Sequence, residues 1–319
     1  MAIVMKPIAF LSSEWNPAPW IKRAEAAAPG IDIRAWPNIG GDADGIAYAI
    51  AWKPPRDAFD ALPNLQVIFS LGAGVDHIFA VERLPDVPLV RAVNADLTAR
   101  MSEYAVMHTL MHHRQQRLLD RYQSERIWKD PPQPAAAEVR VGVMGLGVLG
   151  RDSAEKLKIM GFDVAGWSRS KKDIPGIPSY HGPDGLKAFL QRTDILIALL
   201  PHTTETDGIL NYALFSQLAH DGVLGAPILI NAGRGRLQVE EDIVRALDDG
   251  TLGAATLDVF VTEPLPADSP LWTHPNVTIT PHNAADSDPD AITRGILKQI
   301  EAYERGEPLK NVVDPKKGY

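Results

Sequence analysis

Three polar side chains with complementary chemistry follow three separate apolar segments in the second half of the chain. Arg234 lies in "NAGRGRLQ", Glu263 in "LDVFVTEPLP" and His282 in "TPHNAA". A histidine can transfer a proton, a carboxylate can orient its ring, and a guanidinium can bind an anionic substrate. Taken singly, Arg234 could be a surface residue, Glu263 could begin a turn with Pro264, and His282 could cap a strand. Together they predict a catalytic site suited to hydride transfer.

A glycine-rich segment, "VGVMGLGVLG", supplies the second chemical signal. Gly145, Gly147 and Gly150 have the G-x-G-x-x-G spacing, directly after an apolar strand and at the start of a helical pattern. In this context the glycines allow a tight turn, close approach of a pyrophosphate and close helix packing, and the helix N-terminus receives the negative charge. The segment predicts dinucleotide binding by the three glycines and by the intervening Leu146, Val148 and Leu149. The alternative is a turn that binds nothing.

A basic turn follows the next predicted strand and indicates which dinucleotide binds. Ser168, 18 residues after Gly150, stands where an NAD-binding protein usually has an acidic residue, and Arg169, Ser170, Lys171 and Lys172 follow it. A carboxylate would repel a 2'-phosphate, whereas hydroxyl, guanidinium and ammonium groups would bind it. The turn therefore predicts NADPH as the preferred cofactor, with NADH possible. The alternative is a solvated basic turn without a ligand.

Two series of apolar, β-branched runs separated by helical patterns must position these residues, which is typical of parallel sheets covered by helices. The expected strands of the first series lie in 7–13, 31–36, 45–52, 65–72 and 87–93, and those of the second in 139–146, 163–168, 194–201, 227–233, 253–260 and 276–282. The sequence thus predicts an α/β protein with two Rossmann-like or flavodoxin-like parallel-sheet domains. Because Arg234, Glu263 and His282 follow strands of one sheet, they should meet at its carboxyl edge.

A long helical pattern and a proline-rich connector separate the two series. We expect a linking helix over about 102–126, and "KDPPQPAAAE" at 129–138 cannot continue it. The last helical pattern, at 288–307, is expected to pack back on the first domain. The predicted organisation is a discontinuous substrate-binding domain (1–101 and 287–319) and a nucleotide-binding domain with the linking helix (102–286).

The composition excludes several classes of function. The net charge of -8 argues against a nucleic-acid partner, and the chain has no cysteine for a disulfide, a thiolate metal site or a thiol nucleophile. No apolar run is long enough to span a bilayer, and the N-terminal segment does not fit a signal peptide, so we expect a cytoplasmic protein with no membrane partner. His108 and His112 have a spacing that could hold zinc, but no third ligand is evident, so we predict no metal site.

The order of the glycine loop, "NAGRGR", "LDVF", "EPLP" and "TPH" resembles the D-isomer-specific 2-hydroxyacid dehydrogenase family over nearly the whole chain. The segments "AIAWKPP", "LGAGVD", "RMSEYAV", "GVMGLGVLG", "WSRS" and "DPKKGY" resemble its glyoxylate/hydroxypyruvate reductase A branch. The resemblance implies NADPH-dependent reduction of small 2-oxo acids such as glyoxylate and hydroxypyruvate. It also implies a nucleotide domain inserted into a substrate domain, a cleft between them that holds the reaction, and a homodimer that uses the linking helix.

The resemblance also implies a role for individual residues. His282 would be the general acid, Glu263 its hydrogen-bonding partner, and Arg234 the group that binds the substrate carboxylate and carbonyl oxygen. In the substrate domain Ala73 and Gly74 would offer backbone N–H groups to the carboxylate, and Trp52 would line the pocket; the alternatives are a purely structural turn and a core aromatic residue. The remaining expected cofactor contacts are Leu200, Pro201, Ala232 and Asp258.

Two other functions remain open from the sequence. A related 2-hydroxyacid dehydrogenase could keep the same nicotinamide chemistry and act on a different 2-oxo acid. A dinucleotide-sensing binding protein could share the fold and retain the catalytic residues. The basic cofactor turn and the lack of an extra recognition segment argue against the second of these.

Overall fold

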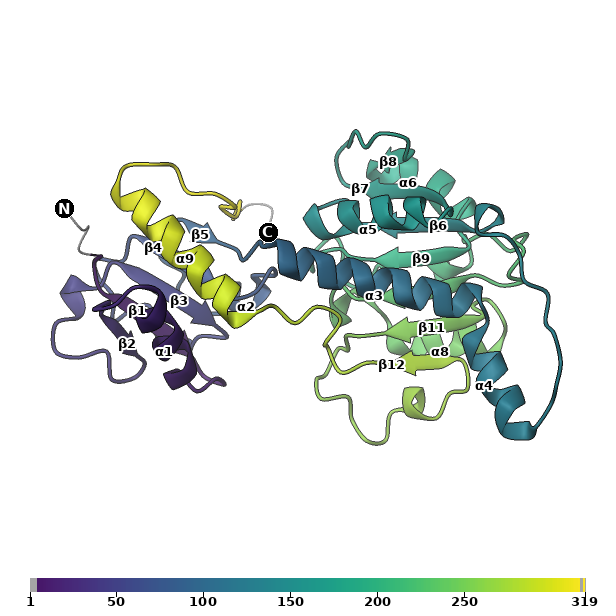
Figure 1. Cartoon of the computed structure of the whole chain (residues 1–319), viewed down its shortest axis with the longest axis horizontal. Helices are drawn as coiled ribbons and strands as arrows, with labels where there is room; N and C mark the ends of the chain where they lie inside the picture. The colour runs from purple at the N-terminus through teal and green to yellow at the C-terminus, as the bar shows by residue number, and fades with distance from the viewer. Residues whose placement is uncertain (1–4, 316–317, 319) are drawn as a thin grey trace. The chain divides into compact units, whose positions relative to one another are not determined.

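The computed structural model describes residues 5–315 and 318, and the chain divides into two compact units, residues 1–97 with 287–319 and residues 98–286. Lys316, Lys317 and Tyr319 of the "DPKKGY" segment lie outside the described residues. Each unit is built on one parallel sheet, which confirms the predicted fold class (Figure 1).

The first unit contains a five-stranded sheet in the order β2-β1-β3-β4-β5, and every pairing is parallel. All five expected strands are present: β1 (Ile8–Ser12), β2 (Ile33–Ala35), β3 (Tyr48–Trp52), β4 (Val67–Ser70) and β5 (Leu89–Val90). The core residues of the central strands are buried because side chains on both faces of the sheet are covered, as a parallel sheet requires.

Two helices from opposite ends of the chain cover one face of this sheet. Helix α1 (Ala18–Ala27) packs beside α9 (Pro289–Glu304), and both contribute to one apolar cluster with β1, β3 and β4. Figure 1 shows α9, in yellow, lying with the purple and blue strands of this unit. Asp288 caps α9 by accepting hydrogen bonds from the backbone N–H groups of Asp290 and Ala291. The expected return of the last helix to the first series of strands is therefore confirmed. Helix α2 (Asp76–Phe79) lies in the cluster of the other face.

The second unit contains a seven-stranded parallel sheet in the order β12-β11-β10-β9-β6-β7-β8. Its strands are β6 (Arg140–Met144), β7 (Asp163–Ser168), β8 (Ser179–His181), β9 (Ile195–Ala198), β10 (Ile228–Asn231), β11 (Ala254–Leu257) and β12 (Val277–Ile279). The six expected strands are all present. Strand β8 was not expected, because its three residues, Ser-Tyr-His, form no apolar run and lie at the partly exposed edge of the sheet. The order of the strands reverses between β6 and β9, because β7 and β8 lie on one side of β6 and β9 to β12 lie on the other. Nucleotides bind at such a switch point in doubly wound sheets.

Helices cover both faces of the second sheet. Helices α3 (Ala95–His113) and α5 (Val148–Ile159) share one apolar cluster with the sheet, and α6 (Gly182–Gln191), α7 (Tyr212–Phe215) and α8 (Glu240–Asp248) share the other. Alternate residues of a strand enter opposite clusters: Val143 faces α5, and Met144 faces the other layer. This period of two explains why the strands read as continuous apolar runs.

The expected single helix over 102–126 is two helices, which corrects the prediction. Helix α3 already begins at Ala95, after Asn94 accepts a hydrogen bond from the backbone N–H of Leu97 (2.7 Å). It ends at His113, and α4 (Gln116–Glu125) begins after Gln115, whose left-handed backbone (φ 54°) breaks the helix. Helical periodicity continues across this break, so the sequence does not reveal it.

Of the paired histidines of α3, His108 is buried and His112 is half-buried. The ring of His112 hydrogen-bonds through Nε2 to Oγ1 of Thr256 in β11 (2.8 Å). Burial lowers the pKa of both His108 and His112 to about 4.

The described part of the chain contains no group of three side chains placed to hold a metal ion. No helix in that part is long and apolar enough to cross a membrane.

A buried ion pair joins the start of β6 to the start of β9. The Asp194 carboxylate is 2% exposed, and it accepts hydrogen bonds from the Arg140 backbone N–H (2.8 Å), Nε (3.0 Å) and Nη2 (2.7 Å). Arg140 also pairs with Asp221, whose side chain is 80% exposed. Hydrogen bonds to Asp194 and then to Asp221 raise the pKa of Arg140, so its charge is permanent.

Replacing Asp194 should destabilise the second unit far more than replacing Asp221. Asp194→Ala leaves a partly buried guanidinium without its main partner, which should lower the free energy of unfolding by about 3 kcal/mol. Asp221→Ala removes only an exposed ion pair and should change stability little. Urea unfolding of the two variants measures the difference, and equal losses would contradict the buried role of Asp194.

Candidate active site

The glycine loop after β6 has the geometry of a phosphate-binding turn. Gly145 adopts φ +110°, and a Cβ there would lie 2.6 Å from the carbonyl oxygen of Leu199. A Cβ on Gly150 would collide with the carbonyl oxygen of Gly145, so this glycine allows α5 to pack closely. Gly147 caps α5 without a side chain, and no atom lies within 4 Å of the place where its Cβ would stand. The N-terminus of α5 therefore presents its backbone N–H groups beside open space, which fits a pyrophosphate.

The basic turn at the end of β7 is only partly available to a ligand. The Ser168 side chain is buried, and its hydroxyl donates a hydrogen bond to the carbonyl oxygen of Ser170 (2.8 Å), so Ser168 closes the turn. Trp167 is also structural, since its Nε1 donates to the Gly182 carbonyl (2.9 Å). Arg169, Ser170, Lys171 and Lys172 are exposed. The turn thus presents three cations and one hydroxyl to solvent, which fits a 2'-phosphate.

The loop after β9 lies against the glycine loop, and the loop after β10 lies against the loop after β9. Gly145 packs on the Leu199–Leu200 backbone, and a Cβ on Gly233 would lie 2.9 Å from the Leu200 carbonyl oxygen. The Ala232 N–H donates to the carbonyl oxygen of Ala198 (3.2 Å). Leu200 and Ala232 are buried, and Pro201 is half-buried. The structure therefore brings these expected cofactor residues to the same edge of the sheet as the glycines.

Two buried amide side chains hold the turn that carries Arg234. Asn231 Nδ2 donates to the Arg234 carbonyl (3.2 Å) and to Oε1 of Gln238 (2.8 Å), and Gln238 Nε2 donates to the Val259 carbonyl (2.9 Å). Asn231 and Gln238 are 0% and 3% exposed. Arg234 itself is half-buried, and its Nη1 donates to the Gly233 carbonyl (2.8 Å). Neither amide was predicted from the sequence as a functional residue, although each is a polar residue beside apolar neighbours.

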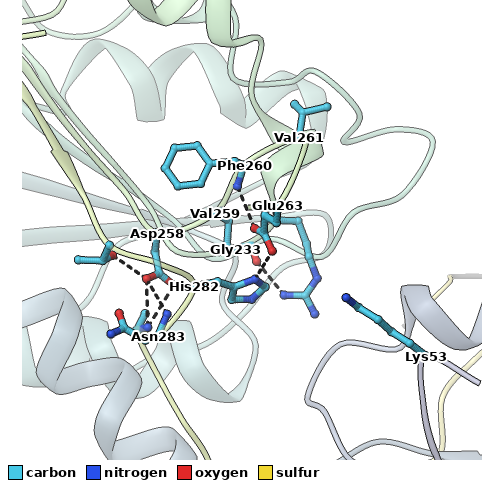
Figure 2. A network of polar contacts seen from close by, with 12 residues as sticks. Lys53, Gly233, Asp258, Val259, Phe260, Val261, Glu263, His282 and Asn283 are labelled. Carbon is cyan, nitrogen blue, oxygen red and sulfur yellow. Dashed lines mark hydrogen bonds and ion pairs between the residues drawn. The ribbon is translucent and has the colours of Figure 1, made fainter. Parts of the chain in front are cut away.

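His282 and Glu263 form a hydrogen-bonded pair. His282 Nδ1 lies 2.7 Å from Glu263 Oε2, and Oε1 of the same carboxylate accepts a hydrogen bond from the Phe260 backbone N–H (3.0 Å), as Figure 2 shows. The carboxylate fixes the ring orientation and, in neutral His282, the tautomer with the hydrogen on Nδ1. Within the part of the chain that the structure describes, Nε2 has no hydrogen-bond partner, and the side chain is 47% exposed. This nitrogen is therefore available to exchange a proton with a ligand.

Asp258 holds the loop on which His282 lies. Its buried Oδ1 accepts hydrogen bonds from Thr280 Oγ1 (2.6 Å) and from the backbone N–H groups of Asn283 (3.0 Å) and Ala284 (3.1 Å) (Figure 2). The His282 N–H donates to the Asp258 carbonyl (2.8 Å), and His282 has φ 52°, a costly conformation for a non-glycine residue. The expected role of Asp258 as a cofactor contact stays a prediction. Its role in holding this loop was not found from the sequence.

Tyr104 of α3 holds Thr280 in place by a further hydrogen bond. The Tyr104 hydroxyl is 2.8 Å from Thr280 Oγ1, and it acts as the donor because Thr280 already donates to Asp258. Burial raises the pKa of Tyr104, which keeps the phenol protonated. Tyr104 thus extends the hydrogen-bonded chain from the segment after β12 to α3.

The expected substrate residues lie in the first unit. Trp52 ends β3, and Ala73 and Gly74 lie half-buried in the loop after β4. Trp52 lies on this loop, since a Cβ on Gly72 would be 2.6 Å from Cζ3 of its indole. The structure therefore brings Trp52 together with the "LGAGVD" segment at the carboxyl edge of the first sheet.

A cavity of about 410 Å³ lies elsewhere in the second unit. Its lining includes His108, His112, Ile228, Gly253 and Asn276. Ile228, Gly253 and Asn276 lie at the amino ends of β10, β11 and β12, whereas Arg234, Glu263 and His282 follow the carboxyl ends. The cavity is thus at the opposite edge of the sheet from the candidate site.

Comparison with known proteins gives consistent matches, and the similar proteins cover nearly the whole chain. The model of the D-isomer-specific 2-hydroxyacid dehydrogenase NAD-binding domain matches residues 106–284. A protein of Escherichia fergusonii named glyoxylate/hydroxypyruvate reductase A is 42% identical over 309 residues, which cover 94% of this chain and 96% of that protein. One of the same name from Serratia proteamaculans is 41% identical over 318 residues and covers 98% and 99%.

Two solved structures are also similar. The NADPH-dependent glyoxylate/hydroxypyruvate reductase of Sinorhizobium meliloti, in complex with NADP and sulfate, is 48% identical with a TM-score of 0.93, covering 98% of this chain and 100% of that one. A probable 2-hydroxyacid dehydrogenase of Rhizobium etli, in complex with NADP, HEPES and L(+)-tartaric acid, has the same identity and TM-score and covers 98% and 99%.

The Asp258 network makes a prediction about stability. Asp258→Asn turns a carboxylate that only accepts hydrogen bonds into an amide whose NH2 group would face backbone N–H donors. The substitution should lower the free energy of unfolding by about 1–3 kcal/mol and speed amide exchange at Asn283 and Ala284. Urea unfolding and hydrogen exchange measure these effects. Thr280→Val, which removes one donor, should have a smaller effect, and unchanged exchange in Asp258→Asn would refute the assignment.

Proposed function

Because the chain belongs to the D-isomer-specific 2-hydroxyacid dehydrogenase family, we propose that it uses NADPH to reduce glyoxylate to glycolate and hydroxypyruvate to D-glycerate. The observation that carries the proposal is the His282–Glu263 pair at the carboxyl edge of a dinucleotide-binding sheet. The relatives from E. fergusonii, S. proteamaculans and S. meliloti are named as glyoxylate/hydroxypyruvate reductases, which supports this substrate class. The chain is an NAD(P)-dependent oxidoreductase.

Three side chains carry the chemistry in this proposal. The reduced nicotinamide supplies the hydride. His282 gives the proton on Nε2 to the 2-oxo oxygen, and Glu263 holds the ring through Nδ1 while the charge on the histidine changes. Arg234 binds the substrate carboxylate and stabilises the negative charge that develops on the oxygen. The buried amides Asn231 and Gln238 position Arg234, and Asp258 positions His282.

The cofactor residues divide by the part of NADPH that they meet. The loop 145–150 and the N-terminus of α5 take the pyrophosphate, and Arg169, Ser170 and Lys171 take the 2'-phosphate. Ser168 shapes that turn through its bond to the Ser170 carbonyl. Leu200, Pro201 and Ala232 pack against the cofactor, and Asp258 adds a polar contact at the nicotinamide end.

The substrate carboxylate meets the first unit in this proposal. The backbone N–H groups of Ala73 and Gly74 bind it, and Trp52 limits the size of the substrate tail. The predicted domain division, 1–101 with 287–319 for substrate and 102–286 for nucleotide, belongs to the same proposal. So do a homodimer that uses α3 and α4 and a location in the cytoplasm, both of which stay predictions.

Initial rates of the purified protein test the function directly. NADPH and NADH are each assayed against glyoxylate, hydroxypyruvate, pyruvate and a bulkier 2-oxo acid. Rapid NADPH oxidation with glyoxylate and hydroxypyruvate supports the proposal. No turnover with any substrate, together with tight NADPH binding, would favour a different substrate or a dinucleotide-sensing protein.

The basic turn should decide the choice of cofactor. Arg169→Ala removes an exposed cation that we assign to the 2'-phosphate, so kcat/KM for NADPH should fall by about 10-fold or more while that for NADH changes little. Steady-state kinetics with both cofactors measure the ratio. Arg305→Ala, which removes another exposed arginine from the first unit, is the control. Equal losses with NADPH and NADH would remove the 2'-phosphate role.

The acid role of His282 makes a separate prediction. His282→Ala should reduce kcat by about 10²–10⁴-fold, because proton transfer to the substrate oxygen is lost. The Kd of NADPH, measured by nicotinamide fluorescence, should stay near that of the wild type. A variant that retains full turnover would overturn the assignment of His282 as the acid.

A further inference from the structure

Three tryptophan rings form a continuous stack in the first unit, and a histidine ring lies at a tilt of 49° against one end of it. The Trp15 ring is stacked on Trp20 (centroids 5.5 Å apart, planes at 3°) and on Trp52 (4.7 Å, 17°). The other neighbour of Trp52 is His77, with ring centroids 4.6 Å apart. Trp52 is the one member of this stack that the proposed function already uses.

The stack arises because β1 and β3 are neighbours. Their parallel register pairs Ser12 with Trp52, so the loop after β1, which carries Trp15, leaves the sheet beside the end of β3. Trp20 lies in α1 and packs against the core of the unit. Trp15 thus lies between Trp20, which is partly buried against the core, and the ring at the proposed substrate site.

Backbone and side-chain hydrogen bonds hold the two loops together. Ser12 Oγ accepts from the Trp15 N–H (3.0 Å), and the Ser13 N–H and hydroxyl donate to the Lys53 carbonyl (3.2 and 2.7 Å). Lys53 also pairs with Glu14 through Nζ (2.9 Å). Lys53 has φ 41°, an unfavourable conformation for a residue with a side chain, and such strain is concentrated at functional sites.

The Trp52 indole also contacts the proposed carboxylate loop. A Cβ on Gly72 would be 2.6 Å from Cζ3 of Trp52, so only a glycine lets the ring lie this close to the loop. Ala73 and Gly74, which we assign to the substrate carboxylate, follow directly. Trp15 and Gly72 together restrict where the Trp52 ring can stand.

Trp15 does not contribute to the apolar core of the described residues. It is 37% exposed and belongs to none of the apolar clusters of the described residues, whereas Trp20 and Trp52 pack against the cluster that contains α9. Its ring contacts are with other tryptophans. An exposed tryptophan held by hydrogen bonds against a substrate-site ring is better explained by positioning than by core packing.

We propose that Trp15 is a positioning residue that fixes the Trp52 indole over Gly72 and so sets the size limit for the tail of the 2-oxo acid. The inference rests on the proposed function of Trp52, Ala73 and Gly74. Without Trp15 one face of the Trp52 ring is uncovered, and the ring gains conformations that leave room for a longer tail. Small substrates then bind more weakly, because the Trp52 ring is no longer held in place against them. Bulkier substrates are no longer excluded by the ring.

Trp15→Ala tests the proposal in the full-length enzyme. The KM for glyoxylate and hydroxypyruvate should rise about 3- to 10-fold, with a smaller change in kcat. The ratio of kcat/KM for glyoxylate to that for 4-methyl-2-oxopentanoate should fall by about 10-fold or more, and the KM for NADPH should not change. Trp15→Phe keeps an aromatic ring and should restore most of the wild-type ratio.

A control variant and stability measurements distinguish a positioning role of Trp15 from a role in folding. Trp272→Ala removes a tryptophan that is 51% exposed in the second unit and should leave the substrate ratio unchanged. Melting temperatures of all variants are compared, and Trp15→Leu replaces Trp15→Ala if the latter does not fold. Failure of the leucine and phenylalanine variants to fold would make Trp15 a structural residue and overturn the proposal.

An unchanged substrate ratio in folded Trp15→Ala would also overturn it, as would equal rises in the KM values for substrate and NADPH. These results are distinct from a failure of the proposed function. In that case the wild-type enzyme itself would reduce none of the 2-oxo acids with NADPH.

Discussion

The buried carboxylate of Asp258 lies where β11 and β12 end, and the geometry of the candidate site depends on the hydrogen bonds that it accepts. A negative charge that is removed from water is costly unless donors surround it. Here the donors are the Thr280 hydroxyl and the backbone N–H groups of Asn283 and Ala284. Meeting this requirement determines the path of the chain through residues 280–284. His282 is held in its left-handed conformation on that path, so the need to satisfy a buried charge places the ring beside Glu263.

The same edge of the sheet is joined laterally by close main-chain contacts. Gly145 lies on the Leu199–Leu200 backbone, Gly233 lies on the Leu200 carbonyl, and a Cβ on Gly235 would collide with the Phe260 carbonyl. Side chains would separate these loops, so the glycines allow the loops after β6, β9, β10 and β11 to form one continuous surface. Gln238 adds a buried hydrogen bond between the last two loops, and Asn231 donates a hydrogen bond that holds Gln238 in place. Preorganisation of this kind lets catalytic groups act without rearrangement.

The sequence predicts the elements better than it predicts the interactions between them. Buried parallel strands read as apolar runs, so all eleven expected strands were found, whereas β8 is short, polar and at an edge. Arg234, Glu263 and His282 could be predicted as candidates because polar residues after such runs lie at one edge of a parallel sheet. Asn231 and Gln238 could not, because their function is to satisfy neighbouring backbone groups and depends on loop geometry. The break at Gln115 was missed for a similar reason, since helical periodicity continues through it.

Charge distribution explains how an acidic chain can bind anionic ligands. The net charge is -8, yet the residues that we assign to the carboxylate and the 2'-phosphate include Arg234, Arg169 and Lys171. Opposing charge is close by: the pKa of Glu205 is lowered mainly by its hydrogen bond to Thr203, and Arg169 contributes to the same shift. Glu205 is exposed, so solvent and salt screen its effect on Arg169. The cations of the turn therefore keep a local attraction for phosphate, while the overall negative charge opposes binding of a polyanion such as nucleic acid.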